Sequence, residues 1–563
     1  MNAFLKTYRL ALTPLSPIHI GCGEDFEPTN YVIDDGVLYG FDPSRAVLTD
    51  LQKAKLADVG NRASLLGIQR FFRDNASIFK AHADVLMPVR AGVARIYEQR
   101  VGRAANIESS GNSVFNQLFI ERNSYTGRRS LPYIPGSSFK GAIRTAWLDE
   151  LNGQRQPGDV QYSFKGEAKS TVVMEKRLFK GDFQTSPLRL LKIADLMPAA
   201  QHDPARRVLY AVNLKKRQVL KDGQEIQPKG IAARKECILH GQYRAFRADA
   251  VLPSLDPHTD SKNTPASELR PTDLRQIASQ SNAYNLTRLR RELTVLDGRG
   301  MLNPVWKQSL EQLLAGELGN KLTMGNAFLI RLGRYGGADS KTLSGEGVAH
   351  IKIMGAKGQP PTYESSTKTV WLAAENETDQ KHLLPFGWAV VEIDPQDGDL
   401  PQLKAWCDAQ SKDRPDMTEL RKQFEADKQA ALQQKAEQAA LAAQRLEAKK
   451  AEELAVHQRT QRLATLSEQG RLIEALQQRC EDWASKMPPN GNFKPQEANI
   501  AKSGLFQDAS KLITVATTSA AWSADDRAAL ADMLEQWLPK VVAPWGREEK
   551  KKLKFSALRG QTG

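Results

Sequence analysis

The chain has 563 residues, of which 41% are hydrophobic and 26% are charged, and its 79 Lys and Arg against 65 Asp and Glu give a net charge of +14. The length suggests about three domains. The composition is that of a globular protein and excludes collagen-like, mucin-like and wholly disordered chains. The charge is uneven, because residues 51–300 hold 41 basic and 24 acidic side chains. We therefore expect a polyanionic partner for that stretch.

Membrane insertion and metal chemistry find no support in the sequence. The uncharged apolar stretch at 10–23 is short and contains Pro14 and Pro17, so neither a transmembrane helix nor a signal peptide is expected. The cysteines form no C-x-x-C pair and the histidines form no H-x-x-x-H motif. We expect no disulfide, no metal, no cofactor and a cytoplasmic location. The cysteines are Cys22, Cys237, Cys407 and Cys480.

The N-terminal pattern is typical of β-strands. Residues 7–20 read as a strand that ends in a tight turn at Gly21-Cys22-Gly23. Two β-branched and aromatic runs at 31–33 and 37–41 flank an Asp-Gly pair, which predicts a hairpin. Helices are expected over 42–51, capped by Asp42 or Ser44, and over 65–79.

A Pro-Gly turn at 135–136 leads into helical spacing, in which Ile143, Trp147 and Leu151 share a face. Ser137 or Ser138 should cap this helix, and the preceding loop should direct backbone N–H groups outward. Downstream, we expect an exposed loop over 253–272, helices over 284–296 and 305–318, and several strands. Those strands are expected at 188–196, 208–212, 237–243, 328–332, 348–353, 369–372 and 385–393.

After about residue 415 the composition predicts helix only. Residues 416–466 contain no Gly or Pro and are expected to form one helix of about 75 Å, at 1.5 Å per residue. Its leucines are irregularly spaced, so no coiled coil is predicted. Residues 471–542 should form a small bundle anchored by Trp483, Trp522 and Trp537, and residues 547–559 a basic tail.

Two glycine-containing segments, 133–144 and 333–341, carry basic residues and are candidates for phosphate contact. Neither has the G-x-x-x-x-G-K-[ST] pattern of a nucleotide-hydrolysing loop. Glycine lets a backbone approach a phosphate closely, and Lys or Arg supplies the charge. The alternative is that the glycines only make turns and the charges form a solvated face. The candidate RNA-binding residues are His19, Ser137, Ser138, Lys140, Arg144, Gly333, Arg334, Gly336, Gly337 and Lys341, with Tyr133, Phe139 and Tyr335 as candidates for base stacking.

No catalytic group stands out from the residues alone. His19 sits at a strand end, where a general base could meet an RNA 2′-OH, but a lone histidine is more often a structural or contact residue. Glu24, Asp25 and Glu27 could hold a magnesium ion, although an exposed acidic loop is the favoured interpretation.

The sequence resembles the RAMP proteins of type III CRISPR effectors. The start, 12–24 with 31–34 and 38–39, is similar to their N-terminus, and 133–144 (YIPGSSFKGAIR) matches their most specific internal motif. The resemblance covers residues 1 to about 400. In its start and size the chain is most similar to the fifth Csm subunit of type III-A complexes, which caps the filament at the 3′ end of the CRISPR RNA.

The resemblance implies an α+β fold with two ferredoxin-like, RRM-related domains, expected at 1–205 and 206–410. It also implies contact with CRISPR RNA, with the backbone RAMP subunit and with the small helical subunit, and target RNA is a further candidate partner. The loop 333–341 corresponds to the family's glycine-rich loop but departs from it in detail. An all-α extension, with a long helix at 411–470 and a small helical domain with the basic tail at 471–563, lies outside the resemblance.

The function that this resemblance implies is a non-catalytic RNA-binding structural subunit that supports CRISPR RNA maturation and antiviral RNA-guided defence. Two alternatives stay open. One is a RAMP endoribonuclease that processes CRISPR RNA with His19 as general base, and the other is a backbone RAMP subunit that cleaves target RNA. The helical extension is either an arm that binds a partner or a solvated helix.

Overall fold

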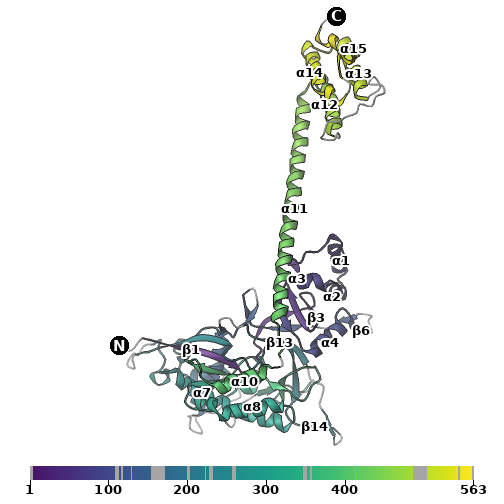
Figure 1. The fold of residues 1–563 in the computed structure, drawn as a ribbon. Helices are drawn as coiled ribbons and strands as arrows, with labels where there is room; N and C mark the ends of the chain where they lie inside the picture. Colours follow the sequence, from purple (N-terminus) through teal and green to yellow (C-terminus); the bar gives the residue numbers. More distant parts are fainter. Residues whose placement is uncertain are drawn as a thin grey trace. The chain divides into compact units, whose positions relative to one another are not determined.

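The computed structural model of the chain divides into two compact units, Met1–Gln434 and Lys435–Gly563 (Figure 1). Each unit is described by itself. The described residues are 4–107, 113–115, 118–127, 130–153, 171–199, 203–221, 224–226, 232–255, 262–345, 351–355, 358–412, 414–485, 504–542 and 545–560.

The N-terminal unit contains two large sheets. The first has the order β11-β17-β1-β23-β18, with β12 also paired to β17 and all pairs antiparallel. Its strands are β1 (Leu5–Pro14), β11 (Lys192–Ile193), β12 (Met197–Pro198), β17 (Phe246–Pro253), β18 (Ala327–Arg331) and β23 (Trp388–Ile393). The second has the order β2-β8-β16-β13-β21-β22. Its strands are β2 (Gly21–Phe26), β8 (Ile120–Asn123), β13 (Arg206–Lys215), β16 (Ala232–Ile238), β21 (Thr369–Ala374) and β22 (Leu384–Pro385).

Smaller sheets and helices complete the described part of this unit. A three-stranded sheet has the order β3-β4-β5, and four strand pairs stand apart from the large sheets. Their strands are β3 (Tyr31–Asp34), β4 (Val37–Phe41), β5 (Ala83–Pro88), β6 (Ala104–Ile107), β7 (Ser113–Phe115), β9 (Tyr125–Thr126), β10 (Leu131–Pro132), β14 (Val219–Lys221), β15 (Gln224–Ile226), β19 (Ile351–Ile353) and β20 (Thr362–Glu364). The helices are α1 (Asp50–Asn61), α2 (Leu65–Asp74), α3 (Ala76–Ala81), α4 (Ala91–Arg100), α5 (Gly136–Gly153), α6 (Thr171–Leu178), α7 (Leu274–Gly298), α8 (Pro304–Ala315), α9 (Glu317–Thr323) and α10 (Pro401–Ser411).

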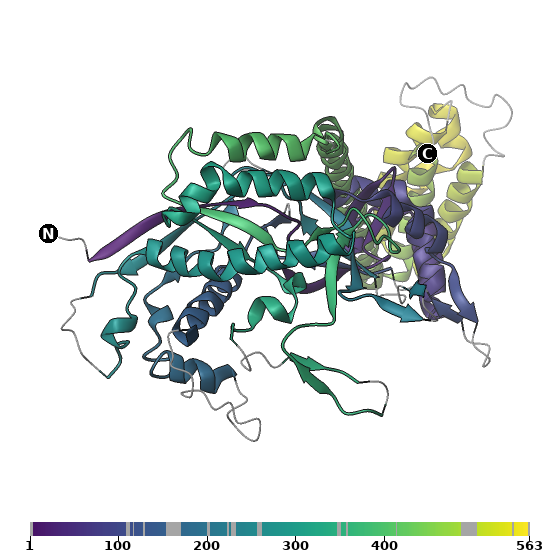
Figure 2. The ribbon, with the colours of Figure 1, turned by 90° about the horizontal axis from the view of Figure 1, so that it is seen from below.

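The side of the first sheet formed by β18 and β23 is buried on both faces. Successive side chains of a strand point to opposite sides, so each strand there contributes to two cores. In β18, Phe328 and Ile330 join a core with α5, whereas Ala327 and Leu329 join a second core with α8 and α10. Seen from below, teal helices lie over this part of the unit (Figure 2). Both faces of β18 are therefore covered, which explains its unbroken hydrophobic run.

Helix α7 also closes the open edge of the first sheet at β18. The Asn282 side chain donates to Ala327 O at 2.9 Å and accepts from the Leu329 N–H at 2.8 Å, as a neighbouring strand would. Ser281 and Asn285 both donate to Leu329 O, at 2.7 and 3.0 Å. These bonds satisfy an otherwise unpaired strand edge and fix the strand that leads into the glycine loop at 333–341.

The mixed α+β fold with an all-α C-terminal part is confirmed. The count of ferredoxin-like domains and the boundary near residue 205 stay predictions. Each large sheet combines strands from both sides of that boundary, since β1 pairs with β17 and β23, and β8 pairs with β16. Any division of the unit must therefore allow for these long-range pairings.

Several local predictions are confirmed and several are wrong. The hairpin at 31–41 is formed by β3 and β4. Gly21 and Gly23 do not form a turn; they lie in β2, where a register shift occurs between Gly21 and Asp25. The helix expected over 42–51 is a 3-10 turn at Pro43–Arg45, and α1 begins only at Asp50, after the Thr49 capping box. Residues 188–196 contain only the two-residue strand β11.

The C-terminal helices are the long α11 (Thr418–Thr465), α12 (Glu468–Ser485), α13 (Gly504–Thr518), α14 (Ala524–Val541) and α15 (Arg547–Lys552). Trp522 is buried and Trp537 packs against the bundle core, as predicted. Trp483 is 51% exposed, so its predicted role as a core anchor is wrong. The expected basic tail is folded: a 3-10 turn at Phe555–Arg559 packs on the bundle.

Candidate nucleic-acid interface

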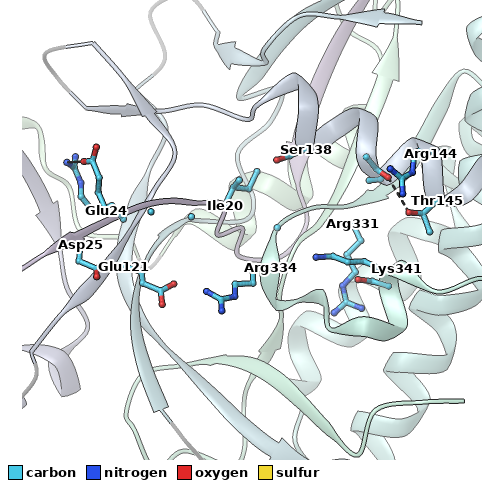
Figure 3. Close-up of a pocket in the computed structure, with 17 residues that line it drawn as sticks. Ile20, Glu24, Asp25, Glu121, Ser138, Arg144, Thr145, Arg331, Arg334 and Lys341 are labelled. Carbon is cyan, nitrogen blue, oxygen red and sulfur yellow. Dashed lines mark hydrogen bonds and ion pairs between the residues drawn. The ribbon is translucent and has the colours of Figure 1, made fainter. Parts of the chain in front are cut away.

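A cleft of about 750 Å³ lies between α5, the loop that follows β18, and strands β2 and β8. It joins segments that are far apart in the sequence, and both candidate glycine segments contribute to it (Figure 3). The lining residues are Ile20, Gly21, Gly23, Glu24, Asp25, Glu121, Arg122, Ser138, Gly141, Ala142, Arg144, Thr145, Arg331, Gly333, Arg334, Ser340 and Lys341.

Helix α5 presents a face of small residues to the cleft. Ser138, Gly141, Ala142 and Thr145 line it at the i, i+3, i+4, i+7 spacing of one helical face. A Cβ atom added at Gly141 would meet nothing within 4 Å. Glycine in a helix interior costs about 1 kcal/mol relative to alanine, so Gly141 keeps space in the cleft at the expense of helix stability.

The first turn of α5 is held by another segment. The helix begins at Gly136, whose N–H donates to the Asp195 carboxylate at 2.7 Å. The predicted cap at Ser137 or Ser138 is therefore wrong, because both residues lie inside the first turn of α5 and a carboxylate distant in sequence takes the first amide. The carboxylate also suits the positive end of the helix dipole.

Gly333 brings the glycine loop against the segment between β1 and β2 that contains His19. Its φ is +85° and its ψ is −175°, a region that is essentially open only to glycine. A Cβ atom at this position would lie 2.2 Å from the backbone oxygen of His19. Tyr335 then anchors the loop, since its ring is buried 5.2 Å from that of Trp371 and 5.3 Å from that of Phe386.

Charge is unevenly distributed along the cleft: Glu24, Asp25 and Glu121 lie at one end, and Arg144, Arg331, Arg334 and Lys341 lie toward the other (Figure 3). Three of the five basic lining residues are paired. Arg122 is 3.3 Å from Glu24, Arg144 is 3.6 Å from Glu175, and Arg331 is 2.8 Å from Glu292.

The two remaining basic residues, Arg334 and Lys341, are exposed. Within the described part of the chain, neither side chain makes a hydrogen bond or an ion pair. A cation without a protein counter-charge keeps its full attraction for a mobile anion. The part of the cleft at the glycine loop is therefore suited to a phosphate group.

His19 does not line the cleft. Its side chain is buried, with Nδ1 2.7 Å from the backbone oxygen of Glu236 and Nε2 3.5 Å from Oε2 of Glu121. A general base must come within hydrogen-bond distance of the proton that it removes. In this arrangement His19 supports the wall of the cleft and does not reach a ligand.

Beneath this wall lies a buried ion pair between Arg206 and Glu236, with Nη1 and Oε1 2.9 Å apart. The second oxygen of Glu236 accepts from the Asn123 N–H at 3.1 Å. The Asn123 side chain in turn accepts from the Ile20 N–H at 2.8 Å. This chain of bonds connects β16, β8 and the start of β2, and so sets the position of the acidic end.

Glu121 stays ionised to low pH. Its interactions with His19 and Lys235 lower its pKa from 4.5 to about 2. A carboxylate whose pKa is depressed by folding stabilises the fold above its unfolded pKa and loses that contribution as the pH falls through the folded pKa. We expect the stability difference between wild type and Glu121→Gln to shrink from about pH 5 to pH 2, as measured by calorimetry across that range. A difference that is constant with pH would contradict this.

The structure brings five of the ten predicted RNA-binding residues together in the cleft: Ser138, Arg144, Gly333, Arg334 and Lys341. The others do not line it, namely His19, Ser137, Lys140, Gly336 and Gly337. Burial lowers the pKa of Lys140, which is half-buried.

Two of the three predicted stacking residues are core residues. Phe139 and Tyr335 are buried, so neither offers a free ring face, and Tyr133 is half-buried. Sequence reasoning missed Gly141, Thr145 and Arg331. The i+3 and i+7 spacing from Ser138 could have indicated the first two, but nothing local indicates that Arg331 reaches the cleft.

In the part of the chain that the structure describes, no group of three or more His, Cys, Asp or Glu residues is arranged to hold a metal ion. Glu24 accepts from the Tyr125 hydroxyl at 2.7 Å and faces Arg122. Among the described helices, none combines the length and the apolar character needed to cross a bilayer.

Comparison with known proteins agrees with the motif at 133–144. Residues 11–254 match the sequence model of the RAMP superfamily. Two curated relatives are both described as "CRISPR system Cms protein Csm5". The one from Methanocaldococcus jannaschii is 27% identical over 189 residues, which is 32% of this chain and 40% of the relative. The one from Streptococcus thermophilus is 30% identical over 144 residues, which is 26% of this chain and 38% of the relative.

The matched segments thus span about two fifths of the length of these relatives. Two solved structures are also similar. A Csm–crRNA–target RNA ternary complex of a type III-A system contains a chain that is 17% identical, with a TM-score of 0.41 and coverage of 69% of this chain and 100% of that one. The crystal structure of T. onnurineus Csm5 is 16% identical, with a TM-score of 0.41 and coverage of 68% and 99%.

The sequence motif, the family match and the curated relatives point the same way. Residues 11–254 of this chain match the RAMP superfamily, and the chain is similar to Csm5 proteins.

Proposed function

We propose that the chain is an RNA-binding structural subunit of a type III-A CRISPR ribonucleoprotein, and that it holds the CRISPR RNA backbone in the cleft between α5 and the glycine loop. The curated Csm5 relatives support the kind of complex. The observation that carries the RNA contact is the position of Arg334 and Lys341, two exposed cations beside a glycine loop and the small-residue face of α5.

The finer roles belong to the same proposal. The subunit caps the filament at the 3′ end of the CRISPR RNA, contacts the backbone RAMP subunit and the small helical subunit, and supports CRISPR RNA maturation. One copy per assembled complex in native mass spectrometry is the expected result. Several copies per complex would favour the backbone-subunit alternative.

The RNA contact is tested with the full-length protein and a labelled single-stranded RNA in fluorescence anisotropy at several salt concentrations. Each phosphate contact contributes about 0.7 to the slope of log K against log salt for a single strand. Arg334→Ala/Lys341→Ala should therefore lower the slope by roughly 1.4. The matched control is Lys404→Ala/Lys412→Ala, which removes two exposed lysines outside the cleft.

A steric variant gives a second test. Gly141→Leu places a side chain in open space on the cleft face of α5 and replaces a poor helix former by a good one. It should fold normally and bind RNA more weakly. If both cleft variants bind RNA as the wild type does at every salt concentration, the cleft is not the RNA site.

The endoribonuclease alternative requires His19 to reach the RNA, and its ring is covered by Glu121, Glu236 and Tyr335. We expect no cleavage of a labelled CRISPR RNA precursor by the purified protein. Cleavage by the wild type that His19→Ala abolishes would overturn the non-catalytic role.

A further inference from the structure

The C-terminal segment 547–560 is strongly basic and ordered. It holds six Lys and Arg against two Glu. Leu553, Phe555 and Leu558 are buried in the core of the helical bundle, so the segment is attached along its length. Its charged side chains therefore occupy defined positions on the bundle surface.

Two of the six cations attach the segment to α14. Lys550 Nζ lies 2.9 Å from Oε1 of Glu535. Arg559 Nη2 lies 2.7 Å from Oε2 of Glu535 and 2.9 Å from Oδ1 of Asp532. Glu535 and Asp532 of α14 are thus paired with these two cations.

The other four cations, Arg547, Lys551, Lys552 and Lys554, form what we call the C-terminal basic patch. All four side chains are exposed, and among the described residues none makes an ion pair or a side-chain hydrogen bond. Arg547 and Lys551 are four residues apart on α15 and share a face. The Lys554 N–H donates to Lys551 O at 3.0 Å, which holds Lys554 one turn from Lys551.

Arg547 and Lys551 repel each other at this spacing by a few tenths of a kcal/mol, which offsets the favourable interaction of Lys551 with the helix dipole. We propose that the C-terminal basic patch binds the phosphate backbone of single-stranded RNA as a contact separate from the cleft. Three of its four cations are lysines, which act as compact point charges toward phosphate and do not read bases by bidentate bonding.

The surroundings favour RNA over an acidic protein. A protein interface has an apolar centre with aromatic anchors, but the apolar side chains of this segment, Leu553, Phe555 and Leu558, are buried in the bundle. Without exposed rings or apolar anchors, the patch offers charge alone. We therefore expect binding that is independent of sequence and strongly dependent on salt.

The test uses full-length protein, a labelled uridine 30-mer and anisotropy at several salt concentrations. Lys551→Gln/Lys552→Gln/Lys554→Gln should lower the slope of log K against log salt by roughly 2, for three contacts at about 0.7 each. The control is Lys449→Gln/Lys450→Gln/Lys511→Gln, which makes the same charge change at exposed lysines elsewhere in the unit. Arginine at 551, 552 and 554 should restore the slope.

Three results would overturn the proposal: equal slopes for the patch variant and the wild type, equal losses in the patch and control variants, or displacement of the RNA by polyglutamate as effectively as by unlabelled RNA. The last would assign the patch to an acidic protein. The outcome is independent of the cleft, because Arg334→Ala/Lys341→Ala is measured separately. If the cleft variant or the patch variant fails to change RNA binding, the result for the other site can still be interpreted.

Discussion

Replacing Gly333 by alanine is expected to destabilise the N-terminal unit by roughly 2–4 kcal/mol. The added methyl group would lie 2.2 Å from the backbone oxygen of His19, in a backbone conformation that alanine rarely adopts. The loop can relieve this contact only by moving away from the segment that contains His19. Calorimetry and hydrogen exchange of the 327–345 region measure the loss, and RNA affinity should fall with it.

Substitutions at two other glycines distinguish the cost of the steric contact from the cost of the strained backbone conformation. Gly337 has a similar conformation, with φ +73°, but a Cβ atom there meets nothing within 4 Å. Gly337→Ala should therefore show the strain alone, about 1–3 kcal/mol. Gly141→Ala, in the open face of α5, should stabilise the helix by up to about 1 kcal/mol. A Gly333→Ala protein as stable as Gly337→Ala would show that the close contact is absent.

Breaking the ion pair beneath the cleft should have an effect of similar size. Glu236→Gln leaves the buried guanidinium of Arg206 without its counter-charge, and removal of one partner of a buried pair costs about 3–5 kcal/mol. The neutral amide is also a weaker acceptor for the Asn123 N–H. Calorimetry of the N-terminal unit measures the loss.

An exposed pair provides the comparison. Glu311, at 3.2 Å from Lys307 on α8, is about half exposed, and Glu311→Gln should change the stability by no more than about 0.5 kcal/mol. Glu236→Gln/Arg206→Met should lose less than the sum of its single variants, because both charges are then removed. Equal losses for Glu236→Gln and Glu311→Gln would mean that the buried pair contributes no more than a surface pair.

The combined results would also show how the cleft is built. Gly333 acts through backbone contact with His19, in the connection between β1 and β2, and Glu236 acts through Asn123 on the adjacent start of β2. Neither side chain needs to touch RNA. Both variants should therefore lower RNA affinity through the shape of the cleft, with a change in the salt slope smaller than that of Arg334→Ala/Lys341→Ala.

Local sequence patterns determined much of the fold. The hairpin at 31–41, the strand β18, the helix after Pro135 and the long α11 all follow from periodicity and turn chemistry, which act between near neighbours. The motif at 133–144 also led to the superfamily. The uneven charge had indicated a polyanion, but it did not show which of the many basic side chains are free to bind one.

Tertiary structure decided the rest, because burial and pairing depend on residues far away in the chain. Phe139 and Tyr335 resemble stacking residues in the sequence but are core residues, since α5 packs on β18 and the loop packs on the second sheet. Arg331 is neutralised by Glu292, whereas Arg334, three residues on, is exposed without an ion pair among the described residues.

The surplus of positive charge in residues 51–300 is thus only part of the electrostatic picture. Arg334, Lys341 and the C-terminal basic patch lie outside that stretch, yet they supply the exposed cations on which both RNA proposals rest. The sequence by itself determined many of the elements and the resemblance to RAMP proteins, and it predicted the sign of the partner's charge. Only the tertiary structure decided which cations are left without an ion pair among the described residues, because folding brings carboxylates such as Glu24, Glu175 and Glu292 next to the other cations.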